Sequence, residues 1–254
     1  MSAAAKTLKV DYPTSDGKPM AETDLHRDQM VDAIQTLQHR YRERTNVYVS
    51  GNLLIFYEPG NKRKHVAPDT FVVFGVPKRK RLNYLTWEEG KSPDVLIEIT
   101  SKSTKREDIV TKKTIYRDKF KAKEYILFDP TGDYIEGQLQ GWRRVRGQWK
   151  EMPVHNGKLY CATLGLELHV DGTRLRFFDP ETQQYLANPE ERAEAEKERA
   201  DTEKERAAAE RRRAEAERRR AEQAEAERIR VEQENERLRR EIEALRRGRP
   251  AGGE

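Results

Sequence analysis

The aromatic residues of this chain stop near residue 186. All 3 Trp, all 10 Tyr and all 7 Phe lie before that point, whereas the sequence from Pro189 onward is nearly all Ala, Glu, Arg and Lys. Large apolar side chains supply most of the burial that stabilises a globular core. The sequence therefore predicts one globular region, long enough to bury a substantial core, followed by a segment that has none of its own.

The composition divides the chain into four segments. Charged residues make up 37% of the chain and hydrophobic residues 35%, and the excess polarity is concentrated after residue 186. Pro13, Gly17 and Pro19 favour irregular structure near the start. We expect an irregular lead-in over 1–20, a globular domain over 21–186, a charged helix over 187–247 and a disordered tail over 248–254.

General features favour a cytoplasmic protein. The chain has no run of about 18 apolar residues, so we expect no contact with a membrane. Its first residues lack the continuous apolar segment of a secretory signal. The single cysteine, Cys161, fits a reducing compartment. The net charge of +5 favours polyanionic partners only slightly, because it is small beside the total number of charges.

Periodicity predicts a mixed α/β core. Met30, Ile34, Leu37 and Tyr41 recur at helical spacing after a capping Thr23 or Asp24. A second helix is expected over 106–120, strands over 47–50, 52–58, 68–76, 93–100 and 124–130, and hairpins over 141–152 and 166–179. This order predicts a mixed sheet flanked by helices.

An acid inside an apolar strand marks a candidate site. Glu98 lies in the run VLIEI at 95–99, where a carboxylate is rarely found without a partner. If strands 68–76 and 93–100 pair as antiparallel neighbours, Asp69 meets Glu98. Asp94 shares the face of Glu98 but would lie about 13 Å away along the strand.

Two converging carboxylates require a positive partner. Mg²⁺, or Mn²⁺ in its place, is held by one or two carboxylates together with waters and a substrate phosphate. Such an ion can lower the pKa of water and stabilise charge on a phosphate under attack. Lys112 is the best candidate for a nearby ammonium group. A purely structural pairing of Glu98 with Lys112, without a metal, is the alternative.

The same residues carry a family resemblance. Pro68 and Asp69, then Glu98, in an order of helix, strands, helix and strand, resemble the PD-(D/E)XK superfamily of restriction-endonuclease-like nucleases. The segment PDVLIEITSKSTKREDIVTKKTIYRDKFKAKEYILFDP at 93–130 is more closely similar to the Uma family (Uma-two) of bacterial endonucleases. The resemblance implies that Asp69 and Glu98 bind the metal and that Lys112 serves as the catalytic lysine. Thr100 stands where the superfamily pattern has its lysine.

Further residues are secondary candidates for this site. The resemblance allows an additional acid or hydrogen-bonding group near the start of the first helix. Asp94 is a further candidate, although capping of the strand entrance or pairing with Lys91 is its simpler explanation. Asp108 is expected to pair with Lys112 at i,i+4 spacing and so to orient it. The secondary candidates are Asp94, Glu22, Asp24, His26 and Tyr116.

Two basic runs flank the strand that begins after Pro68. In loops beside a carboxylate site, such side chains can neutralise DNA phosphates. Solvated loops are an equally good explanation. The candidate nucleic-acid-binding residues are Lys62, Arg63, Lys64, Lys78, Arg79, Lys80 and Arg81.

The segment from residue 190 carries a heptad repeat. One seam position is occupied by Ala193, Ala200, Ala207, Ala214 and Ala221, and later by Asn235 and Ile242. The other seam position is Glu from 196 to 217 and then Val231, Leu238 and Leu245. We expect a solvated helix at first and pairing into a homodimer after about Ala224, with Asn235 favouring a parallel dimer in register. A lone solvated helix is the alternative.

The sequence thus predicts a Mg²⁺-dependent DNA endonuclease that is made dimeric by its carboxy-terminal helix. Two copies would supply two active sites, which suits cutting both strands. A non-catalytic nucleic-acid-binding module and a scaffold that works through its coiled-coil tail are the alternatives.

Overall fold

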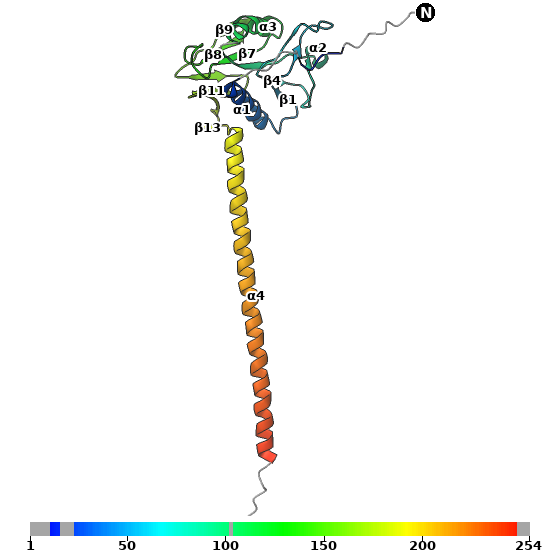
Figure 1. Cartoon of the computed structure of the whole chain (residues 1–254), viewed down its shortest axis with the longest axis vertical. Helices are drawn as coiled ribbons and strands as arrows, with labels where there is room; N and C mark the ends of the chain where they lie inside the picture. Colours follow the sequence, from blue (N-terminus) through cyan, green and yellow to red (C-terminus); the bar gives the residue numbers. More distant parts are fainter. Residues whose placement is uncertain (1–10, 16–22, 102–103, 248–254) are drawn as a thin grey trace, which may run out of the picture. The chain divides into compact units, whose positions relative to one another are not determined.

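The chain divides into two compact units, Met1–Arg192 and Ala193–Glu254. The computed structural model describes residues 11–15, 23–101 and 104–247, and Figure 1 draws them in colour. The mixed α/β fold with a long carboxy-terminal helix confirms the fold class that the sequence predicts.

The helices and strands of the first unit follow the predicted order, with additions. The helical elements are α1 (Asp24–Arg40), α2 (Thr86–Glu89), the π-helical turn η1 (Glu107–Lys112) and α3 (Lys113–Asp118). The strands are β1 (Val47–Ser50), β2 (Ile55–Phe56), β3 (His65–Val66), β4 (Thr70–Phe74), β5 (Tyr84–Leu85), β6 (Val95–Ile99), β7 (Glu124–Phe128), β8 (Leu139–Val145), β9 (Gln148–Glu151), β10 (Lys158–Cys161), β11 (Leu166–Asp171), β12 (Arg174–Asp179) and β13 (Gln184–Tyr185).

A mixed sheet forms the centre of this unit. Its strand order is β1-β4-β6-β7-β8-β9, with β6 and β7 parallel and the other neighbours antiparallel. The predicted antiparallel pairing of the strand after Pro68 with the strand after Pro93 is confirmed, with Thr70 opposite Ile97. This register brings the start of β4 beside the end of β6.

Alternation along β6 gives its two faces different roles. Val95, Ile97 and Ile99 belong to one apolar cluster, while Leu96 belongs to the other, because successive side chains of a strand point to opposite faces. Glu98 therefore shares the face of Leu96. All five residues of β6 are buried, as expected for a strand covered on both sides.

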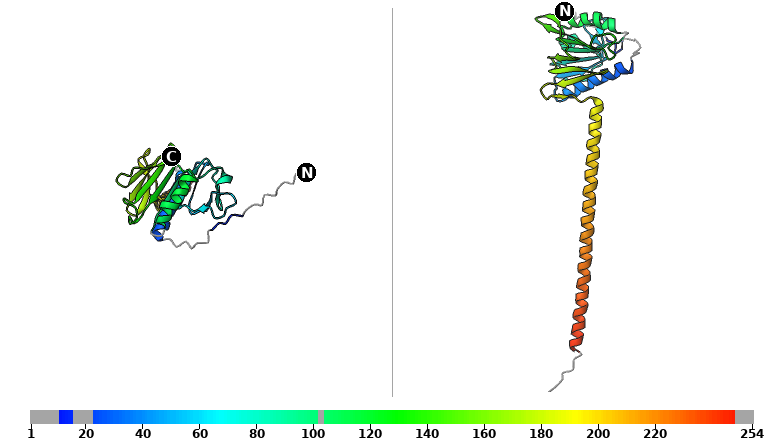
Figure 2. Two further views of the ribbon diagram at one scale, coloured as in Figure 1. Left: turned by 90° about the horizontal axis from the view of Figure 1, so that it is seen from above. Right: turned by 90° about the vertical axis from the view of Figure 1, so that its left-hand side faces the viewer.

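One face of the sheet packs against α1 and a second sheet. Met30, Ala33 and Leu37 of α1 join the cluster that contains Val95, and so do side chains of the sheet β10-β11-β12-β13. The predicted cap is present, since the Thr23 side chain accepts a hydrogen bond from the backbone N–H of His26 at 3.2 Å. Figure 2 shows α1 in blue and α3 in green on opposite sides of the strands.

The other face is covered by η1 and α3 together with aromatic side chains. Tyr116 stacks on Phe120 and meets Tyr125 edge to face, with ring centroids 5.5 and 5.1 Å apart. The predicted helix over 106–120 is present, but its first part is π-helical rather than α-helical. π-Helical turns are rare and often mark functional sites.

Both predicted hairpins are present but belong to different sheets. β8 and β9 extend the central sheet, whereas β11 and β12 form part of the second sheet and turn at Gly172, whose φ is 59°. The predicted strand over 52–58 is mostly irregular, because only Ile55–Phe56 pairs, in the small sheet β3-β2-β5. Asn52 instead donates its backbone N–H to the carbonyl of Pro68 at 2.8 Å.

The second unit consists of most of the helix α4 (Pro189–Arg247). Its side chains from Ala193 to Ala244 are exposed, in agreement with the predicted solvated helix. Among the described residues, no helix has the length and apolar character needed to cross a membrane.

Gly51 follows β1 and lies close to the backbone of Asp69, which precedes β4, so a substitution at Gly51 tests this packing. A Cβ there would lie 1.9 Å from the carbonyl oxygen of Asp69 and 2.5 Å from a side-chain carbon of Ile34. We expect Gly51→Ala to lower the free energy of unfolding by about 1–3 kcal/mol, because backbone would have to shift. Gly60→Asn, at an open position with φ of 78°, is the control and should change it by less than about 1 kcal/mol. Equal denaturation midpoints for the two variants would contradict this packing.

Candidate active site

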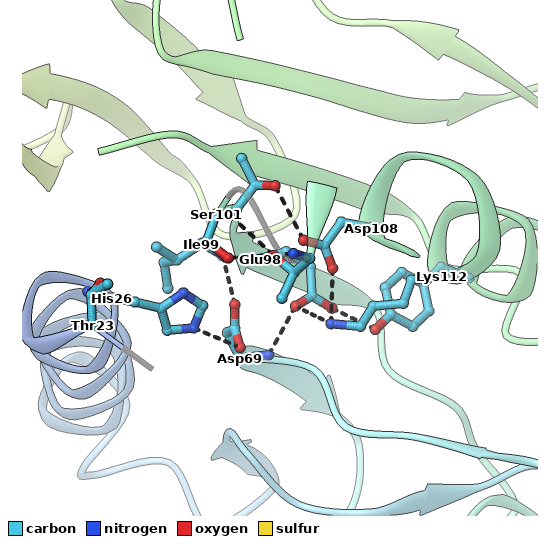
Figure 3. Close-up of polar contacts among 11 residues, drawn as sticks. Thr23, His26, Asp69, Glu98, Ile99, Ser101, Asp108 and Lys112 are labelled. Carbon is cyan, nitrogen blue, oxygen red and sulfur yellow. Dashed lines mark hydrogen bonds and ion pairs between the residues drawn. The ribbon is translucent and has the colours of Figure 1, made fainter. Parts of the chain in front are cut away.

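Asp69 stands at the entrance of β4 and points toward the end of β6. Its Oδ2 accepts the backbone N–H of Ile99 at 2.7 Å, and its own backbone N–H donates to Oε2 of Glu98 at 3.2 Å. The two acids are thus linked through each other's strands, as Figure 3 shows. The structure confirms the predicted meeting of Asp69 and Glu98, because the antiparallel register places them side by side.

Glu98 is fully buried and is held by donors from the covering helix. The Tyr116 hydroxyl donates to Oε1 at 2.6 Å, and the Lys112 ammonium donates to Oε2 at 2.9 Å. A buried carboxylate is tolerated only when such partners compensate its lost hydration. The helix therefore supplies the cation that the apolar strand around Glu98 lacks.

Lys112 lies between two acids at the end of η1. Its Nζ is 2.9 Å from both Glu98 Oε2 and Asp108 Oδ1, and its side chain is only 11% exposed. The predicted pairing with Asp108 at i,i+4 spacing is confirmed. Asp108 is held in turn by the Thr100 hydroxyl at 3.2 Å. Thr100, which stands where the superfamily pattern has its lysine, thus uses its hydroxyl to contact Asp108, the acid that pairs with Lys112.

His26 completes the cluster from the opposite side. It lies in the first turn of α1, is 5% exposed, and places Nε2 3.3 Å from Oδ1 of Asp69. In Figure 3 its ring faces the Asp69 carboxylate across from Glu98. Of the secondary candidates, His26 and Tyr116 therefore lie beside the paired acids.

The environment drives the pKa values of the two central acids apart. Burial alone would raise the pKa of Asp69, but the His26 imidazole, the Lys112 charge and the Ile99 N–H together hold it below its usual range. Burial raises the pKa of Glu98 well above its usual range; Lys112 opposes this shift, whereas Asp69 and Asp108 add to it. Two neighbouring carboxyl groups with separated pKa values can perform different tasks.

Lys112 is a charged group at neutral pH. Burial by itself would lower its pKa, but the carboxylates of Glu98, Asp69 and Asp108 outweigh burial and raise it. Burial likewise raises the pKa of Asp108 above its usual range, against the opposing charge of Lys112. A protonated lysine can donate hydrogen bonds and stabilise negative charge, but it cannot accept a proton.

The cluster suits a hard divalent cation by its donors and its charge. Asp69, Glu98 and Asp108 offer three carboxyl groups beside one ammonium group, that of Lys112. Over the described part of the chain, no group of three or more His, Cys, Asp or Glu side chains is spaced to hold a metal. Mg²⁺ needs only one or two carboxylates plus waters, so Asp69 with Glu98 fits that ion.

Two predicted acids lie elsewhere, and one lies outside the described residues. Asp94 sits at the other end of β6, where it accepts the Phe74 N–H and is 3.3 and 3.0 Å from Lys91 and Lys123. Its simpler explanation, pairing with Lys91, is therefore confirmed. Asp24 is exposed and pairs with Arg27 at 2.8 Å, so it does not reach the cluster. Glu22 is not among the described residues.

The second basic run is engaged in contacts within the protein. Lys78 donates to the backbone carbonyls of Tyr41 and Arg42, while Arg79 and Arg81 pair with Glu89 at 2.9 and 2.7 Å. Arg81 also lies 4.0 Å above the Tyr48 ring. Lys80 is exposed. This run follows the end of β4 that is remote from Asp69, which weakens the expectation that it holds DNA beside the acids.

The first basic run is better placed for a substrate. Lys62, Arg63 and Lys64 are exposed in the turn between β2 and β3, shortly before Asp69. Their neighbour His65 contacts the carbonyl of Lys62 at 2.8 Å. Their ammonium and guanidinium groups are therefore accessible to a polyanion.

Sequence reasoning missed the buried carboxylate of Glu124. Glu124 at the start of β7 is paired with Arg143 at 2.6 Å and accepts from the Cys161 thiol and the backbone N–H of Thr163. These contacts join β7 to the segment after β10, a role that depends on chain segments remote in sequence. The available signal in the sequence was a glutamate as the first residue of an apolar strand, but this pattern does not show which residues pair with Glu124.

Removing the ammonium group tests the balance of charge in the cluster. We expect Lys112→Met to lower the free energy of unfolding by about 3–5 kcal/mol, because it leaves buried acids uncompensated. Adding Glu98→Gln to that variant should restore part of the loss. Lys119→Met, at the exposed position directly after α3, is the control and should change stability by less than about 0.5 kcal/mol. Additive effects of the two substitutions in urea denaturation would contradict a direct ion pair.

The separated pKa values predict two titrations by carbon-13 NMR of the carboxyl groups. Glu98 should titrate at a higher pH than Asp69, and Lys112→Met should raise both pKa values. Because the folded pKa of Asp69 is lowered, its contribution to stability exists above the unfolded value of about 3.9 and is lost as pH falls through the folded value. Because that of Glu98 is raised, its contribution exists below about 4.3 and is lost as pH rises through the folded value. The reverse order of titration would refute this assignment.

Comparisons with known proteins identify the family of this chain. No curated protein matches the chain. Among solved structures, the chain is similar to a "putative nuclease belonging to DUF820 from Anabaena variabilis ATCC 29413", with 16% identity and a TM-score of 0.42 over 58% of this chain and 76% of that one. Residues 5–171 match the family described as "Uma2: Putative restriction endonuclease". That match covers more than half of the 254 residues, and the chain therefore belongs to the Uma2 family.

Proposed function

We propose that this protein is a metal-dependent endonuclease that hydrolyses phosphodiester bonds of DNA. The observation that carries the proposal is the convergence of Asp69, Glu98 and Lys112, from two strands and a helix, in a buried cluster that has more acids than cations. Membership of a family of restriction endonucleases supports the reaction class.

The two central acids are the proposed ligands of Mg²⁺ or Mn²⁺. When bound, the ion supplies charge neutralisation for the phosphate and lowers the pKa of water. Asp69, whose pKa is lowered, is ionised and available for this task at neutral pH. His26 holds the Asp69 carboxylate in place from the side away from Glu98. We assign His26 as a positioning residue because it acts through Asp69.

Lys112 is the proposed electrostatic partner of the reacting phosphate. Its raised pKa keeps it protonated, so it orients water or stabilises the charge that develops on phosphate oxygens, and does not remove a proton. Asp108 and Glu98 fix its position from two sides at 2.9 Å. A substrate phosphate would have to share the Lys112 ammonium group with these acids, and a metal ion would have to share the Glu98 carboxylate with Lys112.

DNA is the proposed substrate and the cytoplasm the proposed location. Lys62, Arg63 and Lys64 are exposed in the turn between β2 and β3 and are suited to contact DNA phosphates. The single cysteine, Cys161, is a buried thiol whose pKa burial raises, which fits a reducing compartment. Pairing of two copies through α4 is part of the proposal.

Cleavage assays test the proposal directly. Wild-type protein should cut supercoiled plasmid or single-stranded DNA with Mg²⁺ or Mn²⁺ and stop when EDTA is added. Asp69→Asn, Glu98→Gln and Lys112→Met should each lower the rate by at least about 100-fold, as the loss of one preorganised electrostatic group does. Asp94→Asn, which changes another buried acid on the same face of β6, should cut like the wild type.

The alternatives give different results in the same assay. A wild type that binds DNA but cuts none with any metal would favour a non-catalytic binding module. Equal cutting by wild type and Glu98→Gln would indicate a contaminating nuclease. Lys62→Ala should flatten the log–log salt dependence of DNA binding by about 0.9 if it contacts a phosphate, and leave it unchanged otherwise.

A further inference from the structure

The helix α4 exposes an apolar seam in its last third. Val231, Leu238 and Ile242 are 51%, 46% and 52% exposed, although apolar side chains of this size are usually buried. They lie seven and four residues apart, which places them on one side of the helix. Such a seam indicates a helical partner, and the charges beside it decide which partner and in which direction.

The seam changes character along the helix. In the first half of the seam, one seam position is Ala207, Ala214 and Ala221, and the other is Glu203, Glu210 and Glu217. From residue 228 onward, the seam consists of Arg228, Val231, Asn235, Leu238 and Ile242. The first half of the seam is therefore small and acidic, and the second half is large and mostly apolar. The two halves differ in both size and charge.

Parallel pairing in register would place like charges of the two copies opposite one another. Glu203, Glu210 and Glu217 would each face the same glutamate of the second copy, and Arg228 would face Arg228. The apolar part of a parallel seam, from Val231 to Ile242, is shorter than the three to four heptads that a coiled coil ordinarily needs. The charge pattern thus disfavours the parallel arrangement.

We propose that α4 pairs with α4 of a second copy in antiparallel orientation, centred between Glu222 and Gln223. In that register Ala207 faces Leu238, Ala214 faces Val231, and Glu217 faces Arg228. Leu238 and Val231 each meet an alanine and Arg228 meets Glu217, whereas Ile242 and Asn235 face Glu203 and Glu210. Antiparallel pairing therefore gives complementary side chains at the levels of Arg228, Val231 and Leu238.

The charges at the positions that flank the seam also favour antiparallel pairing. In an antiparallel pair, residues that flank the seam on one side face the equivalent positions of the partner. On one side this brings Arg220 to Glu227, Arg213 to Glu234 and Arg206 to Glu241. In a parallel pair, Arg206 and Arg213 would instead meet the basic residues Arg211 and Arg218 of the partner.

Contacts within α4 compete for some of these side chains. Glu227 and Glu234 lie 3.8 Å from Arg230 and Arg237, and Arg218 pairs with Glu222 at 2.9 Å, all at exposed positions of the helix. Exposed ion pairs of this kind contribute little to stability. An opposing helix that also covers the seam can therefore recruit Arg218, which lies opposite Glu225 of the second copy in the proposed register.

The arrangement determines how far apart the two globular domains attach. Residues 198 of the two copies would stand about 75 Å apart along the axis, because a helix rises 1.5 Å per residue. If the proposed nuclease function holds, the two active sites belong to domains that attach at these two distant points. The pairing itself does not depend on that function.

Engineered cysteines in the full-length chain distinguish the two directions. In a Cys161→Ser background, the variant with both Ala207→Cys and Leu238→Cys should form an intermolecular disulfide on mild oxidation, since these positions face each other. Either substitution alone should give at most a small fraction of that product. Efficient crosslinking by Leu238→Cys alone would overturn the proposal in favour of a parallel dimer. No crosslink in the double variant, or a monomer by analytical ultracentrifugation at about 50 μM, would also overturn it.

Charge exchange in the seam provides an independent test. Glu217→Arg and Arg228→Glu should each raise the dimer dissociation constant by at least about tenfold, because each places like charges opposite one another. The chain with both substitutions should return to within about threefold of the wild type, since the opposite charges are restored with their places exchanged. Glu198→Arg, on the face away from the seam, is the control. An equally weak dimer for the double variant would contradict the pairing of positions 217 and 228.

Discussion

The burial of Glu98 inside an apolar strand is the constraint on which the first unit depends. Its carboxylate cannot remain in the sheet without a cation and hydrogen-bond donors, and the covering helix provides both through Lys112 and Tyr116. This requirement fixes the position of η1 and α3 over β6. The same interaction therefore packs the helix on the sheet and assembles the candidate active site.

The π-helical turn is part of that solution. Asp108 and Lys112 lie at its two ends, and the Tyr125 hydroxyl donates to the carbonyl of Asp108 at 3.1 Å from β7. The turn is thus held from the sheet as well as from within the helix. A wider turn at this place lets one short element carry an acid and a lysine toward the same carboxylate. Asp69 enters from β4, and His26 from the first turn of α1. The cluster consequently draws on β4 and β6 of the central sheet and on α1 and η1, which cover opposite faces of that sheet.

The two units follow different physical rules. In the first, charge is buried and every member of the cluster is fixed by its neighbours, so a change in one group alters the pKa of the others. In the second, charge is exposed, individual ion pairs contribute little, and only the pattern summed along the helix can select a partner. The proposal of an antiparallel pair depends on the charges along the whole helix, whereas the expectation of a parallel pair depended on Asn235 alone.

Local patterns in the sequence by themselves determined the boundary between core and charged helix and the first helix with its Thr23 cap. These features depend on composition and periodicity, which neighbouring residues encode. The pairing of β4 with β6, on which the meeting of Asp69 and Glu98 was conditional, is a tertiary outcome. Only the tertiary structure decided that His26 faces Asp69, that Asp94 and Asp24 lie away from the cluster, and that Lys78, Arg79 and Arg81 make contacts within the protein. Those outcomes depend on where segments remote in the sequence come together, because the same side chain is a ligand, a cap or a solvated charge according to the groups that surround it.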